Sequence, residues 1–296
     1  MGIVLGPNQY GKAEIRLVAV RRDGQRHGLR DLTISTALRG DFADAHLSGD
    51  NANVLPTDTQ KNTAYAFAKQ APVGEVEDFA LRLGRHFLNT REPVRGARIL
   101  VEEHAWERIE VGGAGHEHSF RRGSEEKRTA AVTFDGDAVH VVSGLTDLVV
   151  LKTTGSEFWG YPKDEYTTLP ETTDRILATA VSARWRHLGT DVEWAADHAS
   201  VRAALLEAFA TTHSYALQQT LHAMGAAVLR AHPGIAEIRL SLPNKHHFPV
   251  DLSPFGLRND NEVFLASDRP YGLIEGTVAR DDVAPAPMAW YGLPEF

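Results

Sequence analysis

The 296-residue sequence contains no cysteine. A disulfide framework, a thiolate zinc site and a cysteine nucleophile are therefore excluded together. The G-x-x-x-x-G-K-[ST] phosphate loop, the dinucleotide-binding G-x-G-x-x-G, the H-E-x-x-H zinc motif and the G-x-S-x-G nucleophile elbow are also missing. The common cofactor sites are thus missing, which narrows the chemistry open to any oxidoreductase built on this chain.

The sequence also has no excess of basic charge, because it contains 31 Lys and Arg and 39 Asp and Glu, which gives a net charge of −8. Duplex-binding proteins usually carry the opposite sign because phosphate contacts dominate their affinity, so we expect no nucleic-acid partner. No apolar run approaches the roughly 20 residues that span a bilayer, so we expect no membrane partner. The first residues lack a basic signal-peptide region and the last lack a peroxisomal tripeptide, which favours a cytoplasmic location.

Hydrophobic periodicity predicts that each half of the chain follows the order strand, strand, helix, helix, strand, strand. In the first half the strand patterns are 13–20, 31–38, 97–110 and 128–145, and the helical patterns are 64–70 and 74–88. In the second half the strand patterns are 138–152, 179–188, 237–242, 261–267 and 272–280, and the helical pattern covers 198–231.

Antiparallel strand pairs with helices on one face predict an α+β fold with a half-barrel sheet of eight strands. The Asp-Gly turn at Asp135 places the domain boundary there, giving domains 1–136 and 137–296. The open sheet edges favour closure against another copy of the chain. The divergent tail, "DDVAPAPMAWYGLPEF", is expected to be mobile or to cover an interface.

Three polar strings lie at the ends of these elements: "TDTQKNT", "LKTTGSEFWGYPKDEYTTLPETTDRIL" and "SLPNKHHFPVDL". Together they resemble the urate oxidase (uricase) family, in the family's order and over most of the chain. The resemblance implies two tandem T-fold domains whose sheets close into a barrel on oligomerisation. It also implies a homotetramer with active sites at subunit interfaces, with urate and O₂ as substrates and no metal or organic cofactor.

The resemblance assigns a proton relay to three residues. The Lys of Y-G-K, here Lys12, pairs with the first Thr of T-D-x-x-K-N-T, here Thr57, and the His of N-K-H, here His246, extends the relay. A Thr is a poor base alone and becomes useful beside an amine held neutral, which burial of a Lys can provide.

The resemblance also assigns the groups that hold the substrate. Phe158 stacks on the purine, Arg175 and Gln218 grip its edge, and Leu217 offers a backbone N–H. Asn244, together with Thr57, holds the oxygen or water site above the ring. Thr57 and Asp58 are expected to reach the substrate from a neighbouring subunit. A guanidinium fork and an amide suit the edge of a flat purine anion, and an aromatic plane suits its face.

Without the resemblance, duller interpretations remain open. Lys12 reads as a solvated edge lysine, Thr57 as a helix N-cap, and Arg175 as a surface partner of Glu171. Phe158 reads as core, Leu217 and Gln218 as two sides of a helix, and His246 as a solvated loop residue.

Two other functions compete with urate oxidation. A zinc-dependent pterin-type T-fold enzyme needs three converging histidines, to which "HEH" at 116–118 could contribute. A non-catalytic purine-binding scaffold would keep the substrate grip and lack the relay. Pro56, Pro170 and Pro249 depart from the family pattern, and Pro56 directly precedes Thr57.

Overall fold

The computed structural model describes residues 2–90, 92–267 and 269–294. These residues form two compact units. Of the described residues, unit 1 contains those up to Gly144, the short segment Arg186–Asp197, and residues 284–294. Unit 2 contains Leu145–Trp185 and His198–Val283. The predicted domain boundary near Asp135 stays a prediction.

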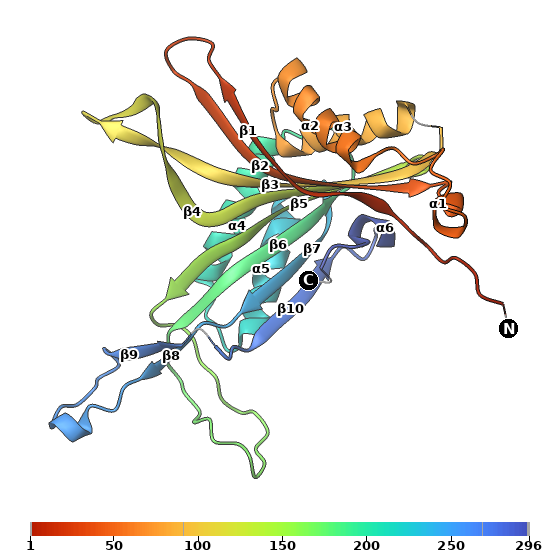
Figure 1. The fold of residues 1–296 in the computed structure, drawn as a ribbon. Coiled ribbons are helices and arrows are strands. Elements are labelled where there is room, and N and C mark those ends of the chain that lie inside the picture. Colours follow the sequence, from red (N-terminus) through yellow and green to blue (C-terminus); the bar gives the residue numbers. More distant parts are fainter. Residues whose placement is uncertain (1, 91, 268, 295–296) are drawn as a thin grey trace. The chain divides into compact units, whose positions relative to one another are not determined.

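Unit 1 is built on antiparallel strands paired in the order β1-β2-β3-β4, with β5 next in the sheet. Helices α2 and α3 lie on one face of these strands (Figure 1). The strands are β1 (Tyr10–Arg21), β2 (Gly28–Gly40), β3 (Val94–Val111), β4 (Ala114–Asp135) and β5 (Ala138–Lys152). The helices are α1 (Ala43–Leu47), α2 (Thr57–Gln70), α3 (Val76–Thr90) and α6 (Pro287–Trp290).

The core of unit 1 forms where the apolar face of the strands packs against the apolar stripe of the helices. Every second residue of β2, including Leu32, Ile34 and Leu38, is buried toward the helices. In α3, Phe79 and Phe87 lie on one buried stripe eight residues apart, as the helical spacing predicts. These side chains belong to one continuous apolar cluster.

Unit 2 repeats this arrangement with its own strands and helices. Its strands follow the order β5-β6-β7-β10, and β7 and β10 pair antiparallel. The elements are β6 (Leu177–His187), α4 (Trp194–Thr211), α5 (Leu217–Ala231), β7 (Ile235–Pro243) and β10 (Leu273–Ala279). A separate two-stranded ribbon pairs β8 (His246–Pro249) with β9 (Phe264–Ser267), joined through the short 3₁₀ helix η1 (Ser253–Phe255).

Four sequence predictions need correction. Strand β4 begins at Ala114, 14 residues before the predicted 128–145 pattern, which also runs into β5. The predicted pair of helices in unit 2 is present, but α4 begins at Trp194, ahead of the predicted 198–231 stretch, and residues 212–216 separate it from α5. Helix α2 begins at Thr57, seven residues before the predicted 64–70 pattern. The strand expected at 261–267 pairs with β8 in the separate ribbon. The predicted sheet of eight strands and the T-fold arrangement are confirmed.

The tail also differs from its predicted character. Ala289 and Trp290 are buried against Ala131 and Val142 on the unit 1 sheet. The Arg98 guanidinium donates to the backbone oxygen of Tyr291. The described part of the tail is therefore packed on unit 1 around Trp290, which differs from the expected mobile tail, while its role in covering an interface stays a prediction. Across the described residues, the helices are all too short or too polar to cross a membrane.

Candidate functional site

The predicted site residues divide between the two units. Lys12, Thr57 and Asp58 belong to unit 1. The others belong to unit 2: Phe158, Arg175, Leu217, Gln218, Asn244 and His246. Each group is built from elements that meet within its own unit.

Lys12 lies at a β-bulge in β1. The β1–β2 register shifts between Lys12 and Ile15, and Glu14 adopts a positive φ of 56°. Gly11 is required next to the bulge because a Cβ there would lie 1.7 Å from the Thr36 carbonyl oxygen. Bulges are over-represented beside active sites, where they re-aim a side chain, and this one directly follows Lys12.

Thr57 and Asp58 form the first turn of α2. Pro56 is the N-cap residue and Thr57 the first helical residue, so the N-cap interpretation of Thr57 is wrong. Asp58 is exposed and bonds to Lys61 and Asn62 one turn later. The Lys61 ammonium lowers the pKa of the Asp58 carboxyl, and the charge of Lys12 adds to this in the same direction. Lys12 and the start of α2 are therefore electrostatic neighbours.

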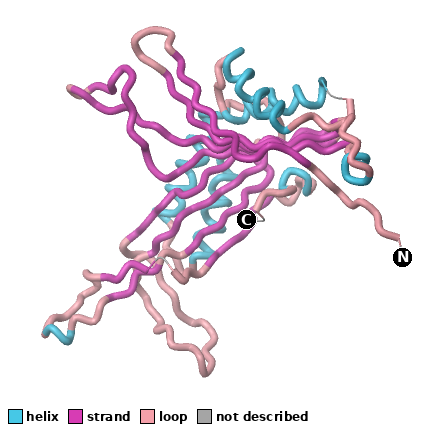
Figure 2. Tube along the Cα trace, viewed as in Figure 1, coloured by secondary structure: helices cyan, strands magenta, loops and turns pink. Residues whose placement is uncertain are grey.

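Phe158 and Arg175 lie in the long connection between β5 and β6, which is loop apart from isolated bridges (Figure 2). Phe158 exchanges two backbone hydrogen bonds with Thr172, at 2.8 and 3.0 Å. The Phe158 ring stacks on Tyr161 with centroids 4.8 Å apart. The Arg175 guanidinium carbon lies 5.1 Å from the Phe158 ring centroid. The loop thus presents a cation beside an aromatic plane.

Glu171 does not serve as the ion partner of Arg175. The Glu171 carboxylate accepts the Gly160 N–H at 3.0 Å and pairs with Lys163 at 3.4 Å. Arg175 instead turns to Ser156, whose backbone oxygen accepts the Arg175 N–H at 2.9 Å and whose Oγ accepts its Nε–H at 3.3 Å. The surface-pair interpretation of Arg175 is therefore wrong.

A buried hydroxyl network joins Arg175 to the start of α5. Ser156, Ser214 and Thr220 are each 0% exposed. Ser156 and Ser214 form a parallel bridge, flanked by the Glu157 N–H donating to the Ser214 oxygen at 2.7 Å. The Thr220 hydroxyl donates to Ser214 Oγ at 2.8 Å. This network fixes the Arg175 loop against the first turns of α5.

Leu217 is the first residue of α5, and Gln218 follows it. The N-cap residue Ala216 supplies no side-chain cap, so the first backbone N–H groups of the helix are not taken by a capping side chain. Gln219 Oε1 accepts the Tyr215 N–H at 2.8 Å, whereas the Gln218 side chain is exposed. Leu217 itself is buried, so its backbone is the part that can face a ligand.

Asn244 and His246 follow β7. The Asn244 N–H donates to the Gly272 oxygen and the Lys245 N–H to the Ala178 oxygen, both at 2.8 Å. These bonds hold the loop between the ends of β6 and β10. The His246 ring stacks on Phe248, and His247 Nδ1 lies 3.0 Å from the Lys245 oxygen, where an N–H donates. His247 thereby supports the loop.

The charge of Arg175 reaches His246. Burial lowers the pKa of His246 below its ordinary value, and Arg175 and then His247 lower it further. Burial also lowers the pKa of the Arg175 guanidinium, which stays a cation at physiological pH. The half-buried His246 is therefore a neutral imidazole at neutral pH and can accept a proton.

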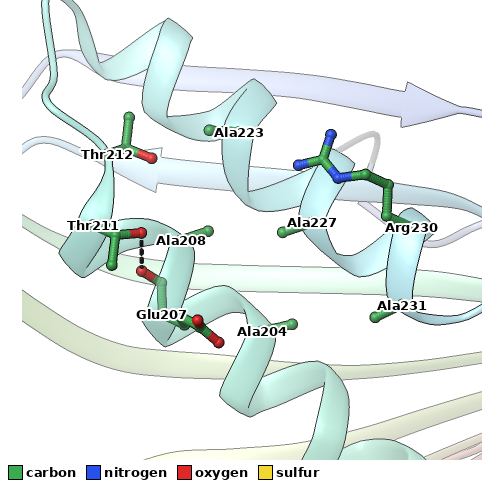
Figure 3. Close-up of a pocket in the computed structure, with 9 residues that line it drawn as sticks. All are labelled: Ala204, Glu207, Ala208, Thr211, Thr212, Ala223, Ala227, Arg230 and Ala231. Atoms are coloured by element: carbon green, nitrogen blue, oxygen red, sulfur yellow. Dashed lines mark hydrogen bonds between the residues drawn. The ribbon is translucent and has the colours of Figure 1, made fainter.

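The structure has one hollow next to Lys12 and another that is remote from the predicted site residues. One of about 340 Å³ is bordered by Gly11 and Ala13, the neighbours of Lys12, and by Ser35 and Arg98. The other, of about 500 Å³, lies between α4 and α5 (Figure 3). Its lining is mostly alanine, with Glu207 and Arg230, and it contains no predicted site residue. The chemistry-bearing side chains lie elsewhere in unit 2.

The histidines of the "HEH" motif lie at strand ends in unit 1. His116 and His118 have ring centroids 4.6 Å apart, and His27 lies 5.7 Å from His118. Within the described residues, no group of three or more His, Asp or Glu side chains is placed to hold a metal ion.

The sequence did not predict the buried polar residues that support the segments carrying the site residues. Thr36 and Gln60 in unit 1, and Ser156, Ser214 and Thr220 in unit 2, are all buried. Thr36 could have been found, because it occupies the core-facing register of Leu32, Ile34 and Leu38 in β2. A polar residue in such a position needs a buried partner.

Comparison with known proteins identifies relatives that match this chain over most of its length. The uricase family model matches residues 8–133 and 141–275. A uricase from Arthrobacter globiformis is 54% identical over 294 residues, covering 99% of this chain and 96% of that protein. A uricase from Dictyostelium discoideum is 37% identical and covers 92% of this chain and 96% of that protein.

Solved structures agree. The crystal structure of the Arthrobacter globiformis uricase matches with a TM-score of 0.92 at 55% identity, covering 97% of this chain and 98% of that one. A Bacillus fastidious uricase, at 23% identity, shares the fold with a TM-score of 0.79 over 93% of this chain and 94% of that one. The full-length match in sequence and structure shows that this chain belongs to the uricase family, the urate oxidases.

Proposed function

We propose that the chain oxidises urate through a proton relay of Lys12, Thr57 and His246, with no metal or organic cofactor. The observation that carries the proposal is the cluster in unit 2, where the Arg175 guanidinium lies 5.1 Å from the Phe158 ring centroid and its charge acts on His246. One small region thus offers a cation, an aromatic plane and a neutral base.

The substrate fits this cluster as an anion with a flat face. Arg175 donates a planar fork to the urate edge, and the exposed Gln218 amide adds a donor and an acceptor. The uncapped start of α5 favours a negative charge near the Leu217 N–H. Gln219 is already bonded to Tyr215, which supports the assignment of the substrate contact to Gln218. Phe158 holds the ring by offset stacking.

The relay removes a proton from the bound urate monoanion. Thr57 passes the proton between Lys12 and the substrate, and His246 passes it onward. Asn244 holds oxygen, and later water, above the ring. Urate gives two electrons to O₂, and water adds to the oxidised ring, so that urate, O₂ and H₂O yield 5-hydroxyisourate and H₂O₂.

The same proposal includes the assembly. β1 is the edge strand of unit 1 and β10 that of unit 2, and unpaired edges favour pairing with another chain. We infer a homotetramer in which two T-fold domains, 1–136 and 137–296, close barrels between subunits. Thr57 and Asp58 then reach the substrate bound by the neighbouring subunit. A fully active monomer after dilution would contradict this assembly, and a cytoplasmic location stays a prediction.

The test follows the near-ultraviolet absorbance of urate in air, with dialysed protein and a chelator present. Oxygen-dependent decay with stoichiometric H₂O₂ release is expected. An oxygen-free sample provides the control. Activity that is abolished by chelation and restored by zinc would overturn the cofactor-free mechanism.

A further inference from the structure

The bulge that carries Lys12 leaves backbone groups without their usual strand partners. At this point the side chains of β2 replace backbone carbonyls as acceptors. The Lys12 N–H donates to Thr36 Oγ1 at 3.2 Å, and the Glu14 N–H donates to Ser35 Oγ at 3.0 Å. The position of Lys12 therefore depends on a hydroxyl group and not only on the sheet ladder.

The Thr36 hydroxyl is itself fixed by Gln60 in α2. Thr36 Oγ1 donates to Gln60 Oε1 at 2.7 Å, and the two residues are 4% and 0% exposed. Gln60 Nε2 donates to the Leu55 oxygen at 3.4 Å. Because the Leu55 oxygen can only accept, the amide orientation is determined, and its oxygen faces Thr36.

This orientation has a directional consequence. A hydroxyl carries one hydrogen, and Thr36 gives it to Gln60, which leaves a lone pair for the Lys12 N–H. Without the Gln60 acceptor, the hydrogen can turn to the Lys12 oxygen, 3.5 Å away. Gln60 thus fixes the direction of the Thr36 hydroxyl hydrogen while Thr36 accepts the Lys12 N–H.

The Thr36–Gln60 pair connects Lys12 to the segment before Thr57, and these are the two relay residues of unit 1. One end of the path is the Lys12 backbone, and the other is Leu55, two residues before Thr57. We propose that Thr36 and Gln60 are positioning residues that set the distance between Lys12 and Thr57. This inference rests on the relay of the proposed function. Neither residue is proposed to touch urate.

The experiment compares single and paired removal of the two polar groups. In Thr36→Val the Lys12 N–H loses its acceptor and Gln60 loses its donor, so both turnover and thermal stability are expected to fall. In Thr36→Val/Gln60→Leu the buried Gln60 amide is removed together with its lost partner, so the melting temperature is expected to recover in part, while the Lys12 N–H still lacks its acceptor. Turnover is expected to stay about 10–100-fold low, the effect of a displacement of about 1 Å in a catalytic group.

The affinity of each variant for a purine ligand separates a positioning role of the pair from a general loss of structure. The Kd of xanthine, a purine that lacks the 8-oxygen of urate, is expected to stay within about three-fold, because its grip comes from unit 2 residues. Thr36→Ser keeps the hydroxyl and is expected to restore turnover. Thr133→Val is the matched control, since Thr133 is 1% exposed in the same unit and its Oγ1 has no hydrogen-bond partner.

Recovery of turnover together with stability in the double variant would overturn the inference, because the pair would then serve folding alone. An equal loss in Thr133→Val would overturn it as well. The Lys12→Met variant distinguishes failure of the positioning inference from failure of the proposed relay. If Lys12→Met keeps full turnover, the proposed relay is wrong, whatever Thr36→Val shows.

Discussion

The two halves of the candidate site are held in different ways. In unit 1, one buried pair, Thr36 and Gln60, connects the Lys12 bulge to the start of α2. In unit 2, the Arg175 loop is held by several backbone bonds and by the hydroxyls of Ser156, Ser214 and Thr220. The proposed function assigns binding to unit 2, where the support is redundant, and proton transfer to unit 1, where the Thr36–Gln60 pair supports the site.

The contrast predicts separable effects. Changes in unit 1 should act mainly on turnover, because the relay acts in the chemical step. Changes in unit 2 should act mainly on affinity, because its groups contact the substrate in both ground and transition states. The following variants test that separation.

Lys12→Met should have the largest effect. Turnover is expected to fall by about 10²–10⁴-fold, the usual contribution of a positioned acid–base group. Xanthine affinity, measured by calorimetry, should change less than about three-fold. Lys69→Met, at an exposed lysine near the end of α2, is the control. An equal loss of turnover and affinity would break the comparison.

Arg175→Gln should come next and show the opposite pattern. Loss of charge-assisted hydrogen bonds to an anion costs about 1.5–3 kcal/mol, so KM and the xanthine Kd should rise about 10–100-fold. Turnover at saturating urate should fall less than KM rises. Arg258→Gln removes an exposed arginine that pairs only on the surface with Asp260 and should change neither value. A fall in turnover alone would assign Arg175 to the chemistry.

Ser156→Ala tests the redundancy of unit 2 and should have a moderate effect. It removes the acceptor of the Arg175 Nε–H and leaves the backbone bonds in place. The xanthine Kd is expected to rise about three- to ten-fold, and the free energy of unfolding in urea to fall by about 1 kcal/mol. Ser253→Ala, at an exposed site, serves as control. A loss as large as that of Arg175→Gln would mean that the support is not redundant.

The pH profile should give the smallest shift. The pKa of His246 is lowered by burial, by Arg175 and by His247, so the neutral imidazole persists below the ordinary His value of about 6.5. Activity is present above the lowered pKa and lost as pH falls through it. The acid limb of kcat/KM should therefore lie below 6.5 and move upward, by less than about one pH unit, in Arg175→Gln. An unmoved limb in that variant would remove His246 from the relay.

The sequence predicted the fold well where patterns are local. Most strands of the eight-stranded sheet and the amphipathic stripe of α3 follow from periodicity within a few residues, but β4 begins 14 residues before the predicted 128–145 pattern. The pair of helices in unit 2 was predicted, but the pattern did not locate the break between α4 and α5, where a buried hydroxyl of Ser214 bonds to Thr220. The start of α2 was missed because "TDTQKNT" reads as a polar loop.

The site could be predicted only through motifs. Lys12, Thr57 and Arg175 lie in short strings that identify the family, whereas composition and spacing favoured solvated or capping roles for each. The register of β2 could have marked Thr36 as a buried polar residue, but its partner was out of reach, because Gln60 lies 24 positions away and their hydrogen bond exists only in the folded chain. Their roles, and those of all the site residues, stay predictions until the variants are measured.

The packed tail has a consequence for how the protein is made. Trp290 completes an apolar cluster with Ala131 and Val142, and Arg186 donates to the Ala284 oxygen at 3.2 Å. Unit 1 therefore needs residues from the start, the middle and the last few positions of the chain. A ribosome releases the start first, at about 5–20 residues per second, so unit 1 waits roughly half a minute or less for its last segment. Until then, the strand faces that Trp290 covers stay exposed to chaperones and to other nascent chains.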